Sequence, residues 1–339
     1  MTAARSNEMN QTIVETRNLT KFFPVYERGV LRNRKIGDIK AVDNVSVKVK
    51  QGEIFGLVGE SGCGKTTLGR TILKLLPATS GSVIFDDVDI FAIRERNKEL
   101  WFRKQAQLIF QDPYLSLNPR ITVSEIVGEP FIIHNRGMSK RDRREQVVKL
   151  LNLCGLEDYH ALRYAHEFSG GQRQRIGIAR ALAVEPQLII ADEPVSALDV
   201  AVQAQILNLL KDIRKQFNLT YIFIAHDLSV VRHISDRIAV MYLGKIVELA
   251  PAEDFIRNPR HPYTHALISA IPIPDPTLER KRLILPGDVA SPLNPPSGCR
   301  FHTRCIYAKA KCSEIEPELI DISPGHKVAC HYPLERKAL

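Results

Sequence analysis

The strongest chemical signal in this chain is a glycine-rich stretch between residues 59 and 67. It follows the pattern G-x-x-x-x-G-K-[ST], in which glycines let the backbone curl so that successive N–H groups face one oxyanion. In this pattern Lys65 reaches the β- and γ-phosphates of a nucleotide, and the Thr66 hydroxyl binds Mg²⁺. The alternative is a glycine-rich turn that matches by chance. The nucleotide-binding residues that we expect here are Gly59, Glu60, Ser61, Gly62, Cys63, Gly64, Lys65, Thr66 and Thr67.

The segments around this stretch favour nucleotide binding. The short apolar run at residues 53–58 is typical of a buried strand, and residues 66–76 are typical of a helix. A strand, a glycine loop and a helix in this order place a bound phosphate at the positive end of the helix dipole. Cys63 lies inside the loop, where it is either a redox switch or a small residue at a variable position.

A second apolar run, residues 188–193, ends in two carboxylates. Asp192 is suited to hold Mg²⁺, directly or through water, because that ion prefers hard oxygen ligands. Glu193 is suited to polarise the water that attacks the γ-phosphate. The alternative for Glu193 is a solvated strand end. Together with the glycine loop, the pair predicts hydrolysis of a nucleoside triphosphate.

A second anion-binding surface is predicted at residues 168–172, where a serine and two glycines precede a helix. One chain does not need two phosphate cradles for one nucleotide, so this cradle is expected to serve ATP held by a partner subunit. The alternative is that Ser169 only caps its own helix, which is compatible with the first role. The residues expected to contact the partner's nucleotide are Ser169, Gly170, Gly171 and Gln172.

Together these motifs resemble the ABC ATPase family, whose signature is LSGGQ; here Phe168 takes the place of the leucine. The resemblance covers roughly residues 12–250. It implies that Gln111 is the Q-loop glutamine, which contacts Mg²⁺ and the attacking water and links them to the transmembrane partner. It further implies that Asp199 belongs to the D-loop at the dimer interface and that His226 is the switch histidine, which contacts the γ-phosphate. Glu193, His226, Gln111 and Lys65 are thus the expected catalytic set.

The resemblance also implies the elements that position these residues. It implies an α/β fold, a P-loop NTPase core of the RecA-like kind with an antiparallel β subdomain and an inserted α-helical subdomain at about residues 112–170. The adenine-stacking aromatic is expected at Phe23, with Phe22 as the alternative, since stacking needs a flat apolar ring. The pattern itself predicts strands at 12–16, 41–50, 107–110, 188–191 and 221–225, a basic surface insertion at 28–36, helices at 146–153 and 171–183, and a hairpin at 238–250.

Three further segments narrow the resemblance to the ATP-binding subunits of oligopeptide and dipeptide importers. They are residues 111–120 (QDPYLSLNPR), residues 261–264 (HPYT) and the tail beginning at Ser297. The first looks more like the second, F-type subunit of that branch. A shift towards proline near residue 251 divides the chain into an ATPase domain, 1–250, and an importer-type C-terminal extension, 251–339.

This branch implies a set of partners. They are a paralogous ATPase subunit, which makes the pair of cassettes a heterodimer, two transmembrane permease subunits and an extracytoplasmic peptide-binding protein. The chain would then be peripheral, on the cytoplasmic face of the inner membrane. Nickel, glutathione or another small solute remains an alternative cargo. A soluble ABC-type ATPase acting on DNA, a translation factor and a non-catalytic ATP-binding regulator are the rival functions.

Four of the six cysteines crowd the tail with the spacing C-x5-C-x6-C-x17-C. This is not the C-x2-C spacing of zinc ribbons or bacterial ferredoxins. The resemblance favours a [4Fe–4S] cluster, with Zn²⁺ or four unliganded thiols as alternatives, and a structural role in holding the tail. The expected ligands are Cys299, Cys305, Cys312 and Cys330, with His302, His326 and His331 as alternatives.

Composition excludes several other classes. Of the 339 residues 44% are hydrophobic and 25% charged, as in ordinary globular proteins, and no apolar run reaches the length of a transmembrane helix. The first ten residues lack the apolar core of a signal peptide, so we expect a cytoplasmic protein. The net charge of +9 is not accompanied by any nucleic-acid-binding module, and an anionic membrane surface explains it better.

Overall fold

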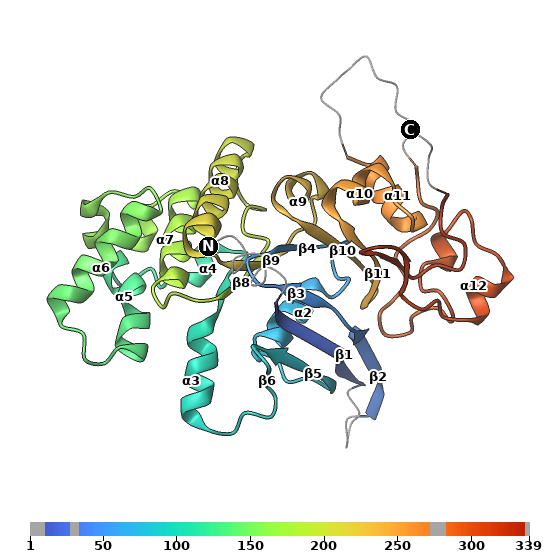
Figure 1. Ribbon diagram of the computed structural model, residues 1–339, viewed down its shortest axis with the longest axis horizontal. Helices are drawn as coiled ribbons and strands as arrows, with labels where there is room; N and C mark the ends of the chain where they lie inside the picture. Colours follow the sequence, from blue (N-terminus) through green and yellow to red (C-terminus); the bar gives the residue numbers. More distant parts are fainter. Residues whose placement is uncertain (1–10, 28–33, 272–282, 336–339) are drawn as a thin grey trace, which may run out of the picture. The chain divides into compact units, whose positions relative to one another are not determined.

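The computed structural model describes residues 11–27, 34–271 and 283–335 (Figure 1). The chain divides into two compact units, which we treat separately. Unit 1 comprises Met1–Gln11, Lys50–Glu53 and Ala92–Ile224; unit 2 comprises Thr12–Val49, Ile54–Phe91 and Ala225–Leu339. The first ten residues, on which the expectation of no signal peptide rests, lie outside the described residues, as do residues 28–33 of the basic segment.

Unit 2 contains the expected antiparallel sheet, in the order β2-β1-β5-β6, with β3 also paired to β1. The strands are β1 (Thr12–Glu27), β2 (Arg34–Val45), β3 (Lys48–Lys50), β5 (Ser80–Phe85) and β6 (Val88–Asp89). The expected insertion at 28–36 is partly wrong, because Glu27 pairs with Arg34 and the following residues continue β2. Ladders are made by backbone groups, so charged side chains on an exposed face do not prevent pairing.

A second group of strands in unit 2 carries the glycine loop. β4 (Ile54–Val58) is buried at every residue, as a continuous apolar run predicts, and it pairs in parallel with β10 (Arg237–Tyr242). The predicted hairpin is confirmed: β10 turns at Leu243-Gly244 into β11 (Lys245–Pro251). β4 leads through the loop into α2 (Lys65–Ile72).

The C-terminal extension adds to this same group of strands. β13 (His326–Val328) pairs with β11, and β12 (Ile320–Ser323) pairs with β13. The remaining helices of unit 2 are short, in keeping with a proline-rich tail. They are α9 (Leu228–Ile234), α10 (Ala252–Arg257), α11 (Pro262–Ser269), the 3₁₀ turn η3 (His302–Arg304) and α12 (Ala310–Glu314).

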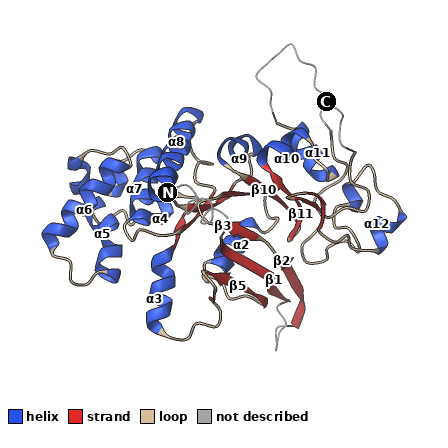
Figure 2. Ribbon diagram, viewed as in Figure 1, coloured by secondary structure: helices blue, strands red, loops and turns tan. Residues whose placement is uncertain are grey.

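Unit 1 is built around three parallel strands in the order β9-β8-β7. They are β7 (Ala106–Ile109), β8 (Leu188–Asp192) and β9 (Thr220–Ile224), within a residue or two of the predicted positions. Parallel strands require helical crossovers, and the helices α3 (Arg96–Gln105), α7 (Gly170–Leu182) and α8 (Val200–Phe217) lie before or between these strands along the chain. Figure 2 shows the three helices in blue. Of these, only α7 was predicted from the sequence.

The segment 112–170 of unit 1 is helical, as expected. Its helices α5 and α6 pack on each other and on α7 (Figure 1). Its elements are α4 (Pro113–Ser116), α5 (Val123–His134), α6 (Lys140–Leu153) and the 3₁₀ turns η1 (Asp158–Leu162) and η2 (Ala165–Glu167). None of the helices in the described ranges has the length and apolar character needed to cross a membrane.

Candidate nucleotide site

The glycine loop of unit 2 adopts a backbone that requires glycine. Gly59 has φ +152° and Gly64 has φ +110°, a region that side chains disfavour. A Cβ on Gly64 would lie 1.9 Å from the carbonyl oxygen of Ala41, and one on Gly59 would lie 2.2 Å from that of Met241. The loop is therefore pressed against neighbouring backbone at both ends. The spacing of glycines in the motif reflects these two close approaches.

Lys65 begins α2 at the end of the loop, and its side chain is buried. Its ammonium donates hydrogen bonds to the carbonyl oxygens of Gly59 (2.8 Å) and Glu60 (3.0 Å). The positive charge is thus held within the loop itself, near the N-terminus of α2, where phosphate binding needs it. Thr66 and Thr67 follow in the first turn of the same helix.

Cys63 is buried within the loop, and its Sγ lies 3.8 Å from the Lys65 Nζ. Burial raises the pKa of this thiol, and Lys65 opposes that shift only in part. A redox-active cysteine needs an accessible thiolate. The environment favours the small-residue interpretation of Cys63 over the redox switch.

The extension of unit 2 contacts the glycine loop at Glu60. Arg304 donates two hydrogen bonds to its carboxylate, Nη1 to Oε2 at 2.8 Å and Nη2 to Oε1 at 3.2 Å. The backbone N–H of Glu60 donates to the Tyr263 hydroxyl at 2.9 Å. Arg304 was not among the residues predicted from the sequence, and Tyr263 was predicted only as part of the HPYT segment. The signal for Arg304 was its position directly before Cys305.

The other expected ATP contacts of unit 2 are Phe23 and His226. Phe23 lies in β1, half-buried, with the Lys21 ammonium 4.9 Å from its ring centroid. Phe22 points to the opposite face of the strand, because successive side chains alternate. His226 is exposed and directly precedes Asp227, whose carboxylate caps α9.

In unit 1 the predicted carboxylates stand at the end of β8. Asp192 is buried, and Glu193 is half-buried with a left-handed backbone (φ +47°). The Glu193 N–H donates to the Ile224 carbonyl at 2.9 Å. Gln111 Nε2 donates to Glu193 Oε2 at 2.9 Å. The structure thus brings together Gln111 and Glu193, which are far apart in the sequence.

The signature residues of unit 1 form the start of α7. Ser169 is its N-cap: the Gln172 N–H donates to Ser169 Oγ at 3.3 Å, and the Ser169 N–H donates to Gln172 Oε1 at 3.1 Å. A Cβ on Gly171 would lie 2.5 Å from Val202 Cγ1 of α8. Asp199 caps α8 by accepting from the Val202 N–H at 3.0 Å. Glycine in the signature therefore also permits close packing of α7 against α8.

The tail cysteines of unit 2 are free thiols around one small apolar pocket. Burial raises the pKa of Cys299 to about 11 and that of Cys330 to about 12. Within the described ranges, no group of three or more His, Cys, Asp or Glu side chains is placed to hold a metal ion. The described residues therefore show no metal centre at these cysteines. The pocket is lined by Cys299, Cys305, Cys312, Cys330, His261, His302 and His331, among others.

The histidines named as alternative ligands have other partners. His302 Nδ1 lies 2.9 Å from the Cys299 carbonyl, and His331 Nε2 lies 2.8 Å from the Ile315 carbonyl. His326 Nε2 lies 2.7 Å from the carboxylate of Glu248.

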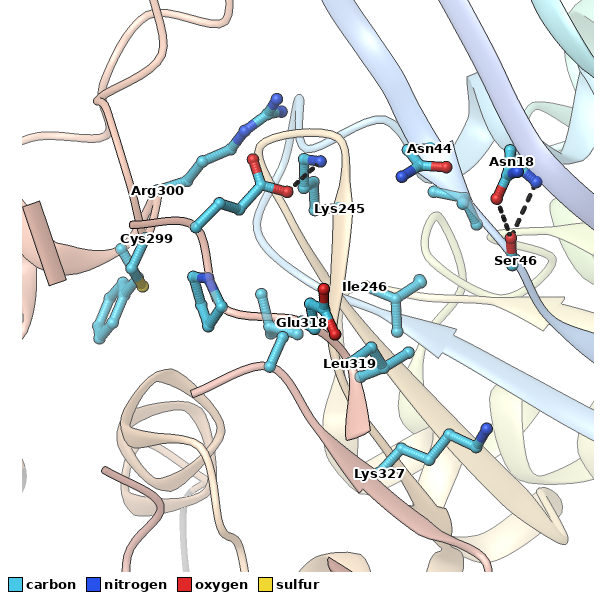
Figure 3. Close-up of a pocket in the computed structure, with 16 residues that line it drawn as sticks. Asn18, Asn44, Ser46, Lys245, Ile246, Cys299, Arg300, Glu318, Leu319 and Lys327 are labelled. Carbon is cyan, nitrogen blue, oxygen red and sulfur yellow. Dashed lines mark hydrogen bonds and ion pairs between the residues drawn. The ribbon is translucent and has the colours of Figure 1, made fainter. Parts of the chain in front are cut away.

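Unit 2 also has a larger cavity, of about 560 Å³, beside the hairpin β10–β11 (Figure 3). Cys299 and Arg300 of the tail line it, together with Lys245, which pairs with Glu316. Its lining mixes positive, negative and amide groups, and no single ligand chemistry is selected by it.

Comparison with known proteins settles the family. Residues 42–196 match the ABC transporter family, and residues 247–312 match the family described as oligopeptide/dipeptide transporter, C-terminal region. The oligopeptide transport ATP-binding protein AppF of Bacillus subtilis (strain 168) is 53% identical over 333 residues, which span 98% of this chain and 99% of the relative. This chain belongs to the ABC transporter ATP-binding proteins. It is an ABC-type ATPase, and the family implies ATP and Mg²⁺ as its ligands.

Other relatives and solved structures support the same family and fold. The putative oligopeptide transport ATP-binding protein YkfD of the same Bacillus strain is 55% identical over 295 residues, covering 86% of this chain and 89% of the relative. A dimeric ATP-binding cassette in a post-hydrolysis state, bound to ADP and Pi, is 32% identical with a TM-score of 0.62, and covers 70% of this chain and 98% of that one. The cbiO1 protein from Clostridium perfringens is 25% identical with a TM-score of 0.60, covering 72% and 90%. The expected P-loop NTPase fold is confirmed.

Proposed function

We propose that this ABC ATPase powers the uptake of di- or oligopeptides as the ATP-hydrolysing subunit of an importer. The observation that carries the proposal is the 53% sequence identity to an oligopeptide transport ATP-binding protein, which extends over nearly the full length and includes the tail. The match of the tail to the oligopeptide/dipeptide transporter C-terminal region supports it further. The chain would work at the cytoplasmic face of the membrane, as a peripheral subunit. We further propose the division into an ATPase domain, 1–250, and an extension, 251–339.

In the proposed mechanism the glycine loop receives the ATP phosphates and Lys65 neutralises the β- and γ-oxygens. Thr66, Gln111 and Asp192 supply oxygen donors of the kind that Mg²⁺ prefers, and the bound ion would neutralise further phosphate charge. Glu193, oriented by Gln111, accepts the proton of the attacking water.

The remaining ATP contacts would be shared between two cassettes. Phe23 stacks on adenine, and His226 contacts the γ-phosphate in the same chain. Ser169, Gly170, Gly171 and Gln172 complete the site of a partner cassette, and Asp199 lies at that interface. We propose that the partner is a paralogue, and that the pair drives two transmembrane permease subunits fed by an extracytoplasmic peptide-binding protein.

Reconstitution tests the proposal. The chain is co-expressed with candidate permeases and a candidate paralogous ATPase from the same genome, placed in proteoliposomes with a candidate binding protein, and assayed for uptake of labelled di- and oligopeptides. We expect ATP-dependent peptide uptake that Glu193→Gln abolishes. Stimulation by a nickel- or glutathione-loaded binding protein without any peptide uptake would assign another cargo. ATP hydrolysis that is indifferent to permeases and binding protein would contradict coupling to transport.

We also propose that Cys299, Cys305, Cys312 and Cys330 hold a [4Fe–4S] cluster. Support comes from their common apolar pocket and free thiols. Four cysteine thiolates are a usual ligand set for a [4Fe–4S] cluster, and these four residues would hold it here. The raised thiol pKa values mean that ligation releases protons, so assembly should be favoured at higher pH.

Anaerobic purification tests the cluster. We expect brown protein with broad visible absorbance and near-equal iron and sulfide, both lost in Cys305→Ser. Colourless protein with stoichiometric zinc would show that Zn²⁺ is the ligand instead, and protein without either metal would contradict a metal centre.

A further inference from the structure

The contact between Arg304 and Glu60 joins the C-terminal extension to the loop that receives the nucleotide. It is a two-bond, fork-to-fork pair, the geometry in which arginine and carboxylate interact most strongly. The Arg304 side chain is 9% exposed and that of Glu60 is 27% exposed. The pair is therefore far less screened by water than a surface ion pair.

The position of Arg304 depends on the fold of the cysteine-bearing tail. η3 lies between Cys299 and Cys305, and its turn is closed by backbone bonds from His302 N–H to the Cys299 carbonyl (2.9 Å) and from Cys305 N–H to the His302 carbonyl (3.2 Å). The Cys299 N–H in turn donates to the Cys312 carbonyl at 2.8 Å. The guanidinium is thus presented by a turn between two cysteines.

Two further contacts hold the tail against the same loop. Phe301, directly before η3, packs on Tyr242 and Tyr263 with ring centroids 5.3 Å from each, and the Tyr263 hydroxyl accepts the Glu60 N–H. Arg300 donates to the Leu243 carbonyl in the β10–β11 turn. The next residue of that turn, Gly244, donates its N–H to the Cys63 carbonyl of the glycine loop at 2.8 Å.

Electrostatics give the Arg304 contact a direct consequence for ATP. Glu60 puts a carboxylate in a loop that must accept the negative triphosphate, and like charges repel each other more strongly where water is partly excluded. Pairing with Arg304 neutralises the Glu60 carboxylate and fixes its orientation. An unpaired one would oppose phosphate binding.

We propose that Arg304 is a positioning residue for ATP: it neutralises Glu60 and ties the cysteine-bearing tail to the phosphate-binding loop. The proposal rests on the assignment of residues 59–67 as the phosphate site. On this proposal the C-terminal extension is part of the nucleotide-binding site. A change in the conformation of the extension would therefore change the affinity for ATP.

The test is titration of the purified full-length chain with a fluorescent ATP analogue and Mg²⁺. Arg304→Gln should raise the Kd by about tenfold, and this defect should shrink as salt is raised from 50 to about 500 mM, because screening weakens the Glu60 repulsion. The double variant Glu60→Gln/Arg304→Gln should bind more tightly than Arg304→Gln alone. Arg304→Lys, which keeps the charge but not the fork, should be intermediate and serves if the glutamine variant does not fold.

The matched control is Lys327→Gln, which removes one positive charge from another tail ion pair, with Asp321 at 3.3 Å. It should leave the Kd unchanged. An Arg304→Gln Kd equal to that of the parent overturns the proposal, as does a double variant no better than the single one. Lys65→Ala tests the phosphate site separately from the role of Arg304. If this variant still binds ATP normally, the assignment of the phosphate site to residues 59–67 is wrong, regardless of the result for Arg304.

Discussion

The residues of unit 1 that we propose for hydrolysis are held by backbone as well as by side-chain contacts. Glu193 has a left-handed backbone, which costs a side-chain-bearing residue free energy and is retained where the surroundings determine it. Its N–H is held by Ile224 and its carboxylate by Gln111. Because the Glu193 carboxylate is already fixed, it loses little further conformational freedom when it binds a water molecule, and this favours catalysis.

We predict that Glu193→Gln lowers ATP turnover by at least about 100-fold, the usual contribution of a general base. Nucleotide affinity should be retained, because the amide keeps the shape and the Gln111 contact. Phosphate release and analogue titration measure the two quantities. Glu185→Gln is the control: Glu185 is also left-handed (φ +51°) but exposed, and its variant should turn over normally. Equal rates for both variants would remove Glu193 from the mechanism.

We predict that Gly64→Ala weakens ATP binding by at least about tenfold. A side chain at this φ costs about 1–2 kcal/mol, and the added Cβ would also meet the Ala41 carbonyl at 1.9 Å. Gly177→Ala, in α7 with open space around the new Cβ, should instead raise stability by up to about 1 kcal/mol. Nucleotide titration and urea unfolding measure the effects. Normal ATP affinity in Gly64→Ala would contradict the predicted role of the loop backbone.

At the level of elements, α11 shows how the extension is positioned. Pro262 begins the helix, where its missing N–H does no harm, and His261 caps it by accepting the Tyr263 N–H at 3.1 Å. The His261 N–H donates to Glu248 at 2.8 Å, and Glu248 also meets His326. The cap sets the direction of Tyr263, which reaches the glycine loop.

We predict that this cap makes the protein acid-sensitive. Burial lowers the pKa of His261 to about 4, from 6.5 in an unfolded chain, so the unfolded state binds more protons between these values. Stability should therefore fall as pH drops from 6.5 to 4, by up to about 3 kcal/mol from this residue. His261→Asn can cap without titrating, and its urea-unfolding free energy should fall less over that range. An identical pH dependence in both proteins would contradict the assignment.

For unit 2 taken whole, the extension belongs to the hydrophobic core. β13 continues the pairing of β11, with Glu248 opposite Val328, and the Ala329 N–H donates to the Val247 carbonyl. Phe301 is 1% exposed, beside Tyr242 and Tyr263. The tail and the core strands of this unit should therefore unfold together.

We predict that Phe301→Ala lowers the free energy of unfolding by about 3–5 kcal/mol, the usual cost of truncating a buried aromatic ring. Ile306→Ala, at a tail position that is 52% exposed, should change it by no more than about 0.5 kcal/mol. Thermal and urea unfolding measure both. A separate low-temperature transition in Phe301→Ala, with the main one unchanged, would show that the tail folds independently.

Much of the candidate site could be predicted from the sequence because its chemistry is local. The glycine loop, the paired carboxylates and the signature each depend on adjacent residue types, which set backbone conformation and helix capping by themselves. Strand cores such as β4 and β8 followed from unbroken apolar runs. The sequence did not predict the long β1–β2 pairing or the helices α3 and α8. Their exposed faces are charged or their hydrophobic periodicity is weak, so these segments are recognised as strands or helices only once the elements that they pack on are known.

The tertiary structure alone decided which distant residues meet. Gln111 reaches Glu193, and Arg304 reaches Glu60 across 244 residues, because strand order and the return of the tail bring these segments together. No local propensity encodes such pairs. The clustering of the tail cysteines predicted that they lie together, and the structure places all four around one pocket. Whether four thiols can hold a ligand depends on where they stand in space, which residue spacing does not determine. Residue types thus determined the ATPase chemistry. Chain topology determined that the C-terminal extension contacts the glycine loop at residues 59–67, through Arg304 and Glu60.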